Sequence, residues 1–228
     1  MKTACIFGAT GVVGQALLSQ LLNHPQYSSV WAITRRPILA PNKTQSTTSL
    51  HHTASFHNEV IVFDKLKDFS LPNVQLDHVF CATGTTLKKT PNLNEYRKIE
   101  VDYAKDIANF SKKHRAHVFS LVSAIGANAR SLNRYLRQKG ELEEYIQSCG
   151  FTSTHIFRPS LIVGNREDFR AAEKISTMVM PLIAPLMIGK LSRYRSLSGE
   201  LIAQQMIEQA NREETGVRII YPAQRKCD

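Results

Sequence analysis

Apolar residues in this sequence form short, nearly continuous runs of the length typical of buried strands. Such runs lie at residues 3–7, 29–34, 59–64, 77–83, 116–123 and 152–159, and a shorter one lies at 216–222. A strand that is covered on both faces needs no alternating polar residues. The runs therefore predict strands of a parallel sheet with helices on both sides.

Between these runs, apolar residues recur three or four positions apart, which is the period of a helix with one buried face. Helices are expected at residues 12–23, 92–114, 131–150 and 197–210, and a polar loop is expected at 37–57. Strands that alternate with helices are typical of the α/β class. We expect one doubly wound parallel-sheet domain over residues 1–228, in which 160–228 contribute a small cap on the substrate side.

The composition changes this picture little. Of the 228 residues, 43% are hydrophobic and 21% are charged, a balance typical of globular proteins. Four cysteines without paired spacing, and no recognisable signal peptide, predict free thiols in the cytoplasm. Residues 178–189 form the most apolar segment, which is too short to span a bilayer. No metal site is expected, because the histidines of the polar loop lack supporting ligands.

The net charge of +10 favours an anionic ligand. Nucleic acid is not the expected partner, because the basic residues are spread over many segments and no nucleic-acid-binding motif is found. We expect a small-molecule substrate or none, and we leave an oligomer open.

A glycine-rich turn follows the first apolar run. The letters GATGVVG place Gly8, Gly11 and Gly14 between a strand and a helix. The first glycine permits a sharp turn, the second lets a pyrophosphate approach the backbone, and the third lets the helix pack on the sheet. The phosphates then lie at the helix N-terminus, where free N–H groups and the helix dipole favour anions. This context predicts a dinucleotide-binding, Rossmann-type fold.

The second apolar run ends in WAITRRP, with Arg35 and Arg36 where NAD-binding sites usually carry an acidic residue. A carboxylate there would repel a 2′-phosphate, whereas a guanidinium can bind it with two hydrogen bonds. The arginine pair therefore predicts NADPH as the cofactor. The alternative is two solvated loop arginines.

Candidate catalytic residues follow the fifth run. Ser123 ends that run, Tyr135 lies twelve residues later, and Lys139 lies four residues beyond Tyr135 on the same helix face. This set suits carbonyl reduction or its reverse, with Ser123 holding the substrate oxygen and Tyr135 transferring a proton. A nearby ammonium and an oxidised nicotinamide would lower the pKa of the tyrosine from about 10. The alternative is a chance pair on an amphipathic helix.

Together these residues resemble the short-chain dehydrogenase/reductase superfamily, and in particular its atypical Tat-interacting-protein-like oxidoreductases. The matching stretches run from Ala4 to Glu173 and read GATGVVG, TRRP, VFDKL, CATGTT, VDYAKDIA, YLRQKGELE and FRPSLIVGNRE. The resemblance implies an NADPH-binding fold. It implies cofactor contacts from Gly8, Thr10, Gly11, Val12, Val13, Gly14, Arg35, Arg36, Asp64, Thr83, Gly84, Tyr135, Lys139, Ile162 and Arg170.

In this resemblance, Asp64 lies near the adenine, Ile162 lies near the nicotinamide, and Arg170 closes over its edge. Val12 and Val13 can offer only backbone amides. The family supplies no substrate that can be transferred.

Three functions compete. The first is an NADPH-dependent oxidoreductase acting on a small carbonyl or alcohol, and the second is an NADPH-binding regulator or redox sensor with little turnover. The third is a sugar-nucleotide epimerase or dehydratase, against which the short C-terminal part and the arginine pair argue. Residues 166–194, interrupted by prolines, are expected to cover the nicotinamide pocket as a lid.

Overall fold

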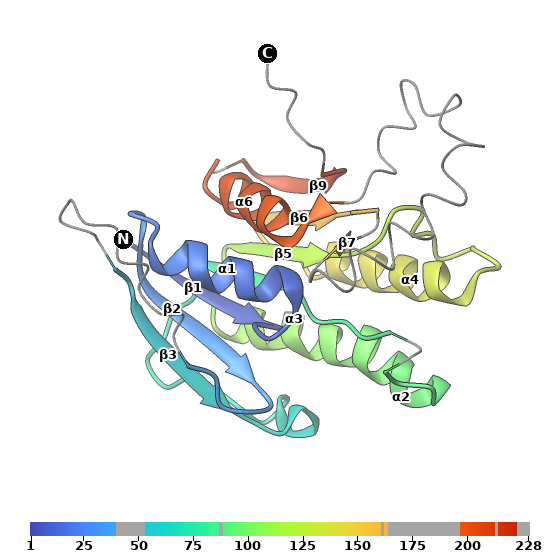
Figure 1. Ribbon diagram of the computed structural model, residues 1–228, viewed down its shortest axis with the longest axis horizontal. Coiled ribbons are helices and arrows are strands. Elements are labelled where there is room, and N and C mark those ends of the chain that lie inside the picture. Colours follow the sequence, from blue (N-terminus) through green and yellow to red (C-terminus); the bar gives the residue numbers. More distant parts are fainter. Residues whose placement is uncertain (40–52, 87–88, 161, 164–196, 213, 223–228) are drawn as a thin grey trace, which may run out of the picture.

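The computed structural model describes residues 1–39, 53–86, 89–160, 162–163, 197–212 and 214–222. Its centre is a seven-stranded sheet in the order β3-β2-β1-β4-β5-β6-β9, in which every neighbouring pair is parallel (Figure 1). The strands are β1 (Lys2–Phe7), β2 (Tyr27–Thr34), β3 (Ser55–Val60), β4 (His78–Cys81), β5 (Val118–Val122), β6 (Ser153–Phe157) and β9 (Gly216–Ile220). The predicted doubly wound parallel sheet is confirmed.

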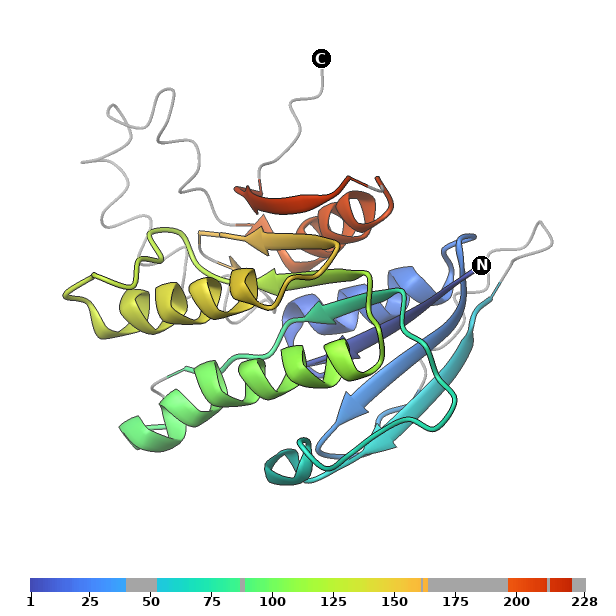
Figure 2. The same cartoon turned by 180° about the vertical axis from the view of Figure 1, so that it is seen from behind.

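Helices cover both faces of this sheet (Figures 1 and 2). Helices α1 (Val12–Leu22) and α6 (Gly199–Ala210) lie on one face, and α3 (Tyr103–Lys113) and α4 (Arg134–Ser148) lie on the other. Strand β1 shows why its sequence is apolar throughout. Its Ala4 and Ile6 enter the core under α1 and α6, whereas Cys5 and Phe7 enter the core under α3 and α4.

The third strand differs from its prediction. The apolar run at 59–64 was expected to form it, but β3 spans Ser55–Val60, and Phe63–Lys65 form a short 3-10 helix, η1. The expected loop at 37–57 is therefore too long at its C-terminal end. Within the described residues β3 pairs only with β2 at the edge of the sheet, and it is partly exposed. An edge strand of this kind does not need an apolar run.

The long helix predicted at 92–114 is confirmed, with one interruption. It begins as α2 (Leu93–Arg97), passes through a π-helical turn, η2 (Lys98–Asp102), and continues as α3. The Asn92 side chain caps its start by accepting hydrogen bonds from the backbone N–H groups of Asn94 and Glu95. Such π-turns occur frequently at functional sites.

A second, small sheet pairs β7 (Ile162–Val163) with β8 (Leu197–Ser198). Gly199 then packs against Val12 at the start of α1, where a Cβ on Gly199 would lie 2.6 Å from a Val12 methyl carbon. Most of the predicted cap, including the whole expected lid at 166–194, lies outside the described residues. Among the described helices, none has the length and apolar character that a bilayer crossing requires.

Candidate functional site

The glycine turn after β1 contains two glycines that the fold itself requires. Gly8 has a φ of +87°, and a Cβ there would lie 2.4 Å from the Ala82 carbonyl oxygen. A Cβ on Gly14 would lie 2.0 Å from the Gly8 carbonyl oxygen. Gly11 is different, because its φ is −81° and a Cβ would come no closer than 3.4 Å, to the Gly8 oxygen. Chain packing thus leaves the outer side of Gly11 open, as a close ligand approach requires.

The same turn presents the N-terminus of α1. Gly11 is the N-cap residue and offers no side-chain hydrogen bond to the first turn. Thr10 and Gly11 are exposed, and Val12 is partly exposed, whereas the Val13 side chain is buried and can offer a ligand only its backbone. An uncapped, accessible helix N-terminus fits the phosphates of a dinucleotide.

Arg35 and Arg36 follow β2 at the same edge of the sheet, and both are exposed. Neither guanidinium forms an ion pair or hydrogen bond within the part of the chain that the structure describes. The turn that carries them is well fixed. The Asn58 amide donates to the Ala32 carbonyl (2.9 Å) and to the Thr34 hydroxyl (2.8 Å), which in turn donates to the Arg36 carbonyl (2.8 Å).

Asp64, the expected adenine neighbour, lies in η1 and is already engaged. Its Oδ1 accepts a hydrogen bond from the Tyr103 hydroxyl at 2.7 Å and lies 2.7 Å from the Lys98 ammonium. Lys98 first, and Tyr103 second, lower the pKa of Asp64. The carboxylate is half exposed, so this contact links η1 to the π-turn without removing Asp64 from the rim of the sheet.

Thr83 and Gly84 follow β4, beside the glycine turn. The Thr83 hydroxyl lies 3.4 Å from the Cys81 thiol. A Cβ on Gly8 would touch the Ala82–Thr83 peptide, so the segments after β1 and β4 are in direct contact. Ile162 lies in β7 and is partly buried. Arg170 lies outside the described residues.

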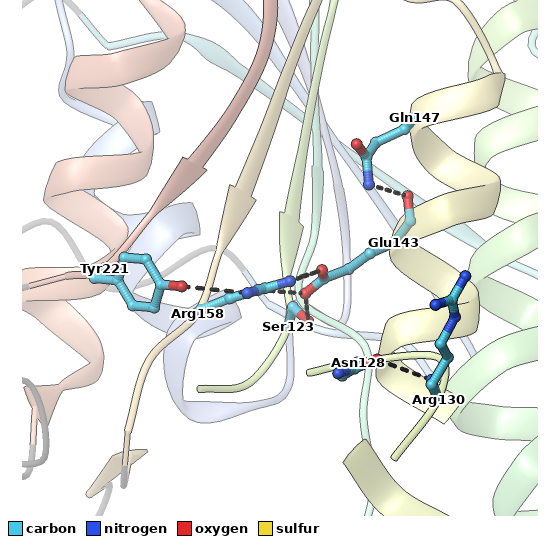
Figure 3. A network of polar contacts seen from close by, with 7 residues as sticks. All are labelled: Ser123, Asn128, Arg130, Glu143, Gln147, Arg158 and Tyr221. Carbon is cyan, nitrogen blue, oxygen red and sulfur yellow. Dashed lines mark hydrogen bonds and ion pairs between the residues drawn. The ribbon is translucent and has the colours of Figure 1, made fainter. Parts of the chain in front are cut away.

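Ser123 directly follows β5, and its hydroxyl donates to Glu143 of α4 (Figure 3). Arg158, which follows β6, holds the same carboxylate through two nitrogens, with Nη2 2.6 Å from Oε2 and Nε 3.1 Å from Oε1. Arg158 also donates to the Tyr221 hydroxyl at 3.2 Å. The hydrogen bond to Glu143 is the main cause that raises the pKa of Arg158.

This network changes the role expected for Ser123. Ser123 and Glu143 are both buried, and the serine proton is directed at the carboxylate rather than at a substrate. In this arrangement the Ser123 oxygen can accept a hydrogen bond, but it does not donate one to a carbonyl.

Tyr135 and Lys139 lie on α4, as predicted, but in different surroundings. Tyr135 is 38% exposed, whereas Lys139 is 4% exposed. The Lys139 ammonium lies 2.8 Å from Oε2 of Glu100, a residue of the π-turn. Desolvation is the main cause that raises the pKa of Tyr135. Lys139 opposes this rise and Glu100 adds to it, so the expected lowering of the pKa is not found in the chain without cofactor.

Four residues of the site escaped sequence analysis, namely Asn58, Glu100, Glu143 and Arg158. Glu143 lies four residues after Lys139, and Arg158 lies in the FRP stretch, so their positions carried a signal. The sequence positions of Glu100 and Asn58 gave no such signal. A glutamate in a helix, or an asparagine in an edge strand, indicates no partner until the tertiary structure is known.

The sites predicted from the sequence thus gather where the parallel strands end. The segments after β1, β2, β4 and β5 supply the glycine turn, the arginine pair, Thr83–Gly84 and Ser123, and α4 supplies Tyr135 and Lys139. The open side of Gly11 and the unpaired arginines fit a phosphate-containing dinucleotide. Ligands of doubly wound sheets bind at this edge.

Known proteins share this fold. A solved structure described as MoeE5 in complex with UDP-glucuronic acid and NAD superposes with a TM-score of 0.69 at 15% identity, covering 97% of this chain and 76% of that chain. Human epimerase family protein SDR39U1 with NADPH gives a TM-score of 0.56 at 14% identity, covering 95% and 73%. At these identities the likeness concerns the fold alone.

Sequence comparison supplies closer relatives and confirms the resemblance noted from the motifs. Protein HTATIP2 of Rattus norvegicus is 28% identical over 172 residues, which are 75% of this chain and 67% of that protein. Protein FMP52, mitochondrial, of Candida albicans is 32% identical over 164 residues, or 72% and 68% of the two chains. The profile of a family described as NAD(P)H-binding matches residues 8–184. Because this match spans well over half of the sequence, the chain belongs to the NAD(P)H-binding family.

Proposed function

We propose that the protein is an NADPH-dependent oxidoreductase that acts on a small carbonyl compound or the corresponding alcohol. The observation that carries this proposal is the arrangement along the carboxyl edge of the sheet. Unpaired Arg35 and Arg36 and the open side of Gly11 lie at the same edge as Ser123, and α4 adds the partly exposed Tyr135. A 2′-phosphate, a pyrophosphate and a reacting carbonyl each have a candidate partner there.

The division of labour follows from these positions. NADPH, when bound, would supply the hydride that reduces the carbonyl carbon. Tyr135 supplies the proton that the carbonyl oxygen takes up, so one hydride and one proton convert the carbonyl to an alcohol. Arg35 and Arg36 hold the 2′-phosphate with charge-assisted hydrogen bonds. Lys139, one turn after Tyr135 on α4, is assigned to orienting the Tyr135 side chain and would also bind the nicotinamide ribose.

The other cofactor contacts are proposed from the family resemblance. They involve Thr10, Val12 and Val13 at the phosphates, Asp64 near the adenine, and Thr83 and Gly84 beside the cofactor. Ile162 and Arg170 complete the set at the nicotinamide. We further propose that residues 1–228 form one NAD(P)-binding domain, with 160–228 as its substrate-side cap.

An NADPH-binding regulator with little turnover is the second candidate. The network around Ser123 favours it, because the serine proton is directed at Glu143 and not at the substrate side. A sugar-nucleotide epimerase is less well supported. The relatives that bind UDP-sugars share only the fold with this chain, and the arginine pair favours NADPH over NAD.

Steady-state oxidation of NADPH against a panel of small aldehydes and ketones separates the two candidates. For an oxidoreductase we expect turnover with at least one compound, and a decrease of about 10²–10⁴-fold in Tyr135→Phe, the usual contribution of a positioned acid. Tyr145→Phe is the matched control, because Tyr145 lies on the same helix and its hydroxyl binds Asn109. Turnover that survives Tyr135→Phe unchanged would contradict the proton-donor role.

The cytoplasm remains a prediction for the compartment. FMP52 of Candida albicans is named as mitochondrial, which makes the mitochondrion the alternative. Fractionation of cells that express the full chain with a small C-terminal tag distinguishes the two.

A further inference from the structure

Glu100 forms a buried ion pair with Lys139 in the middle of the candidate site. The two charged atoms lie 2.8 Å apart, and the side chains are 5% (Lys139) and 3% (Glu100) exposed. Glu100 belongs to the π-turn η2, whereas its neighbours Lys98 and Asp102 in the same turn are exposed. The turn therefore directs one carboxylate inward between exposed charged residues.

The Glu100 carboxylate is also tied to the segment that follows β4. Its Oε1 accepts a hydrogen bond from the Thr85 backbone N–H. A Cβ on Gly84 would lie 3.2 Å from the same oxygen, so the carboxylate packs directly against this segment. The Glu100 side chain thus joins the π-turn, the segment of Gly84 and Thr85, and Lys139.

A buried ion pair of this kind needs a reason other than stability. Desolvation of the two charges offsets much of their attraction, and apolar residues of similar volume often stabilise a fold as well. Both charges here lie beside the residue that is expected to transfer the proton, Tyr135. Perturbed titratable groups in such a cluster are typical of functional sites.

The titratable groups that act on Tyr135 are Glu100 from η2, Tyr96 from α2 and Lys139, which lies one turn later on the same helix. Cys81 of β4 interacts with Lys139. Desolvation and then Glu100 raise the pKa of Tyr96 to about 12. Burial also raises the pKa of Cys81, so neither residue supplies a competing charge near neutral pH. Glu100 and Lys139 are the two charged members of this cluster.

We propose that Glu100 neutralises the Lys139 ammonium and thereby keeps the Tyr135 hydroxyl protonated across the neutral and mildly alkaline range. Glu100 is in this view a positioning residue that acts on Tyr135 through Lys139. The catalytic consequence of this inference rests on the proposed function. The protonation state of Tyr135 itself can be measured whether or not the protein turns over a substrate. A lysine without this partner would instead favour the phenolate.

The proposal fixes the pH behaviour of catalysis. Carbonyl reduction uses protonated Tyr135, so its rate should be flat through neutral pH and fall only above about pH 10. Alcohol oxidation uses the phenolate, so its rate should rise through the same range. Removing the Glu100 charge moves both profiles to lower pH.

The direct test is a phenolate titration of the full chain by ultraviolet absorbance, which needs no substrate. The chain has seven tyrosines, so the Tyr135 signal is the difference between each protein and its Tyr135→Phe partner. In the wild type this difference should appear only above about pH 10. In Glu100→Gln it should move down by at least about one pH unit, because the neighbouring ammonium is then unpaired.

Two variants serve as controls. Asp102→Asn removes a carboxylate from the exposed side of the same π-turn and should leave the Tyr135 titration unchanged. Glu100→Asp keeps the charge and should restore most of the wild-type titration. If Tyr135 titrates in Glu100→Gln as in the wild type, the proposal is overturned.

Lys139→Met tests the pair from its other side if Glu100→Gln does not fold. Without the ammonium, the Glu100 charge alone faces Tyr135, and the pKa of Tyr135 should rise further. A fall would overturn the proposal.

The Tyr135 titration tests the role of Glu100, and the turnover assay tests the proposed function, so each proposal can be contradicted independently of the other. A shifted titration without carbonyl reduction leaves the role of Glu100 intact and removes the proposed function. Carbonyl reduction together with an unshifted titration in Glu100→Gln supports the proposed function and overturns the role of Glu100.

Discussion

The two edges of the sheet bury polar groups in different ways. At the carboxyl edge they include two ion pairs, Lys139 with Glu100 and Arg158 with Glu143. Toward the amino edge they are neutral and hydrogen-bonded. His78 shares a 2.8 Å hydrogen bond with Tyr27, and His155 shares a 3.0 Å hydrogen bond with Ser153.

The two buried ion pairs therefore lie at the edge that carries the candidate site, whereas the buried histidines lie away from it. Desolvation of the histidines lowers the pKa of His78 to about 3 and that of His155 to about 4, so both remain uncharged at neutral pH. Neighbouring hydroxyl groups satisfy both rings, that of Tyr27 for His78 and those of Ser153 and Ser120 for His155. Buried charges are costlier to keep, and here they surround the candidate catalytic residues. The charged edge is therefore the one expected to bind and convert ligands.

The largest effect should come from breaking a pair at the charged edge. Glu143→Ala leaves the largely buried Arg158 without its carboxylate, and we expect the free energy of unfolding to fall by about 3–5 kcal/mol. Glu141→Ala is the control, since Glu141 pairs at the surface with Arg97 and should cost less than about 1 kcal/mol. Urea denaturation of both variants measures the two values. Equal losses of unfolding free energy in the two variants would mean that the buried pair stabilises the fold no more than the surface pair.

The neutral edge should respond to acid instead. Unfolded histidine has a pKa of about 6.5, above the native values, so the unfolded chain binds more protons below that pH. Stability present above pH 6.5 is then lost as the pH falls. The loss should be about 2 kcal/mol per buried histidine between pH 6.5 and 5. Urea midpoints measured at several pH values give this slope.

His78→Gln identifies the source of the slope. Its stability should fall less steeply with acid than that of the wild type, by the equivalent of one proton. His57→Gln, a change at a partly exposed histidine of the edge strand β3, is the control and should change the slope less than His78→Gln does. A slope that is the same in all three proteins would assign the acid response to other groups.

The smallest effect concerns a ligand contact without a structural role. Gly11→Ala should leave the fold intact, because φ is −81° and the added methyl meets no atom closer than 3.4 Å. NADPH binding should weaken by about 1–2 kcal/mol, or roughly 5–30-fold, since the methyl occupies the space of a phosphate. Gly14→Ala is the contrast, because its methyl would collide with the Gly8 carbonyl and should destabilise the fold. Fluorescence titration and thermal unfolding separate the two outcomes.

Much of the fold could be predicted because its central strands are buried on both faces. The runs around Cys5, Phe80 and Phe119 have no exposed side and can form nothing but inner strands. The edge strand β3 could not be placed in this way, since its residues are half exposed and Asn58 and Glu59 break its apolar run. The apolar residues up to Phe63 led to a strand being predicted at 59–64 instead of Ser55–Val60.

The candidate site divides along a similar line. The glycines, the arginine pair, Ser123, Tyr135 and Lys139 occur at spacings that local chemistry makes readable. The glutamates that partner Ser123 and Lys139 are contributed by tertiary packing. Glu100, which pairs with Lys139, lies in a π-turn, and no residue pattern in KIEVD predicts that turn.

We expect the charged edge to bind NADPH through Arg35 and Arg36. Titration of NADPH and NADH into the wild type and into the Arg35→Ala/Arg36→Ala variant measures this preference. The wild type should bind NADPH more tightly by about 1.5–3 kcal/mol, or roughly ten- to a hundredfold, and the variant should bind both cofactors equally. Equal affinities in the wild type would contradict the claim.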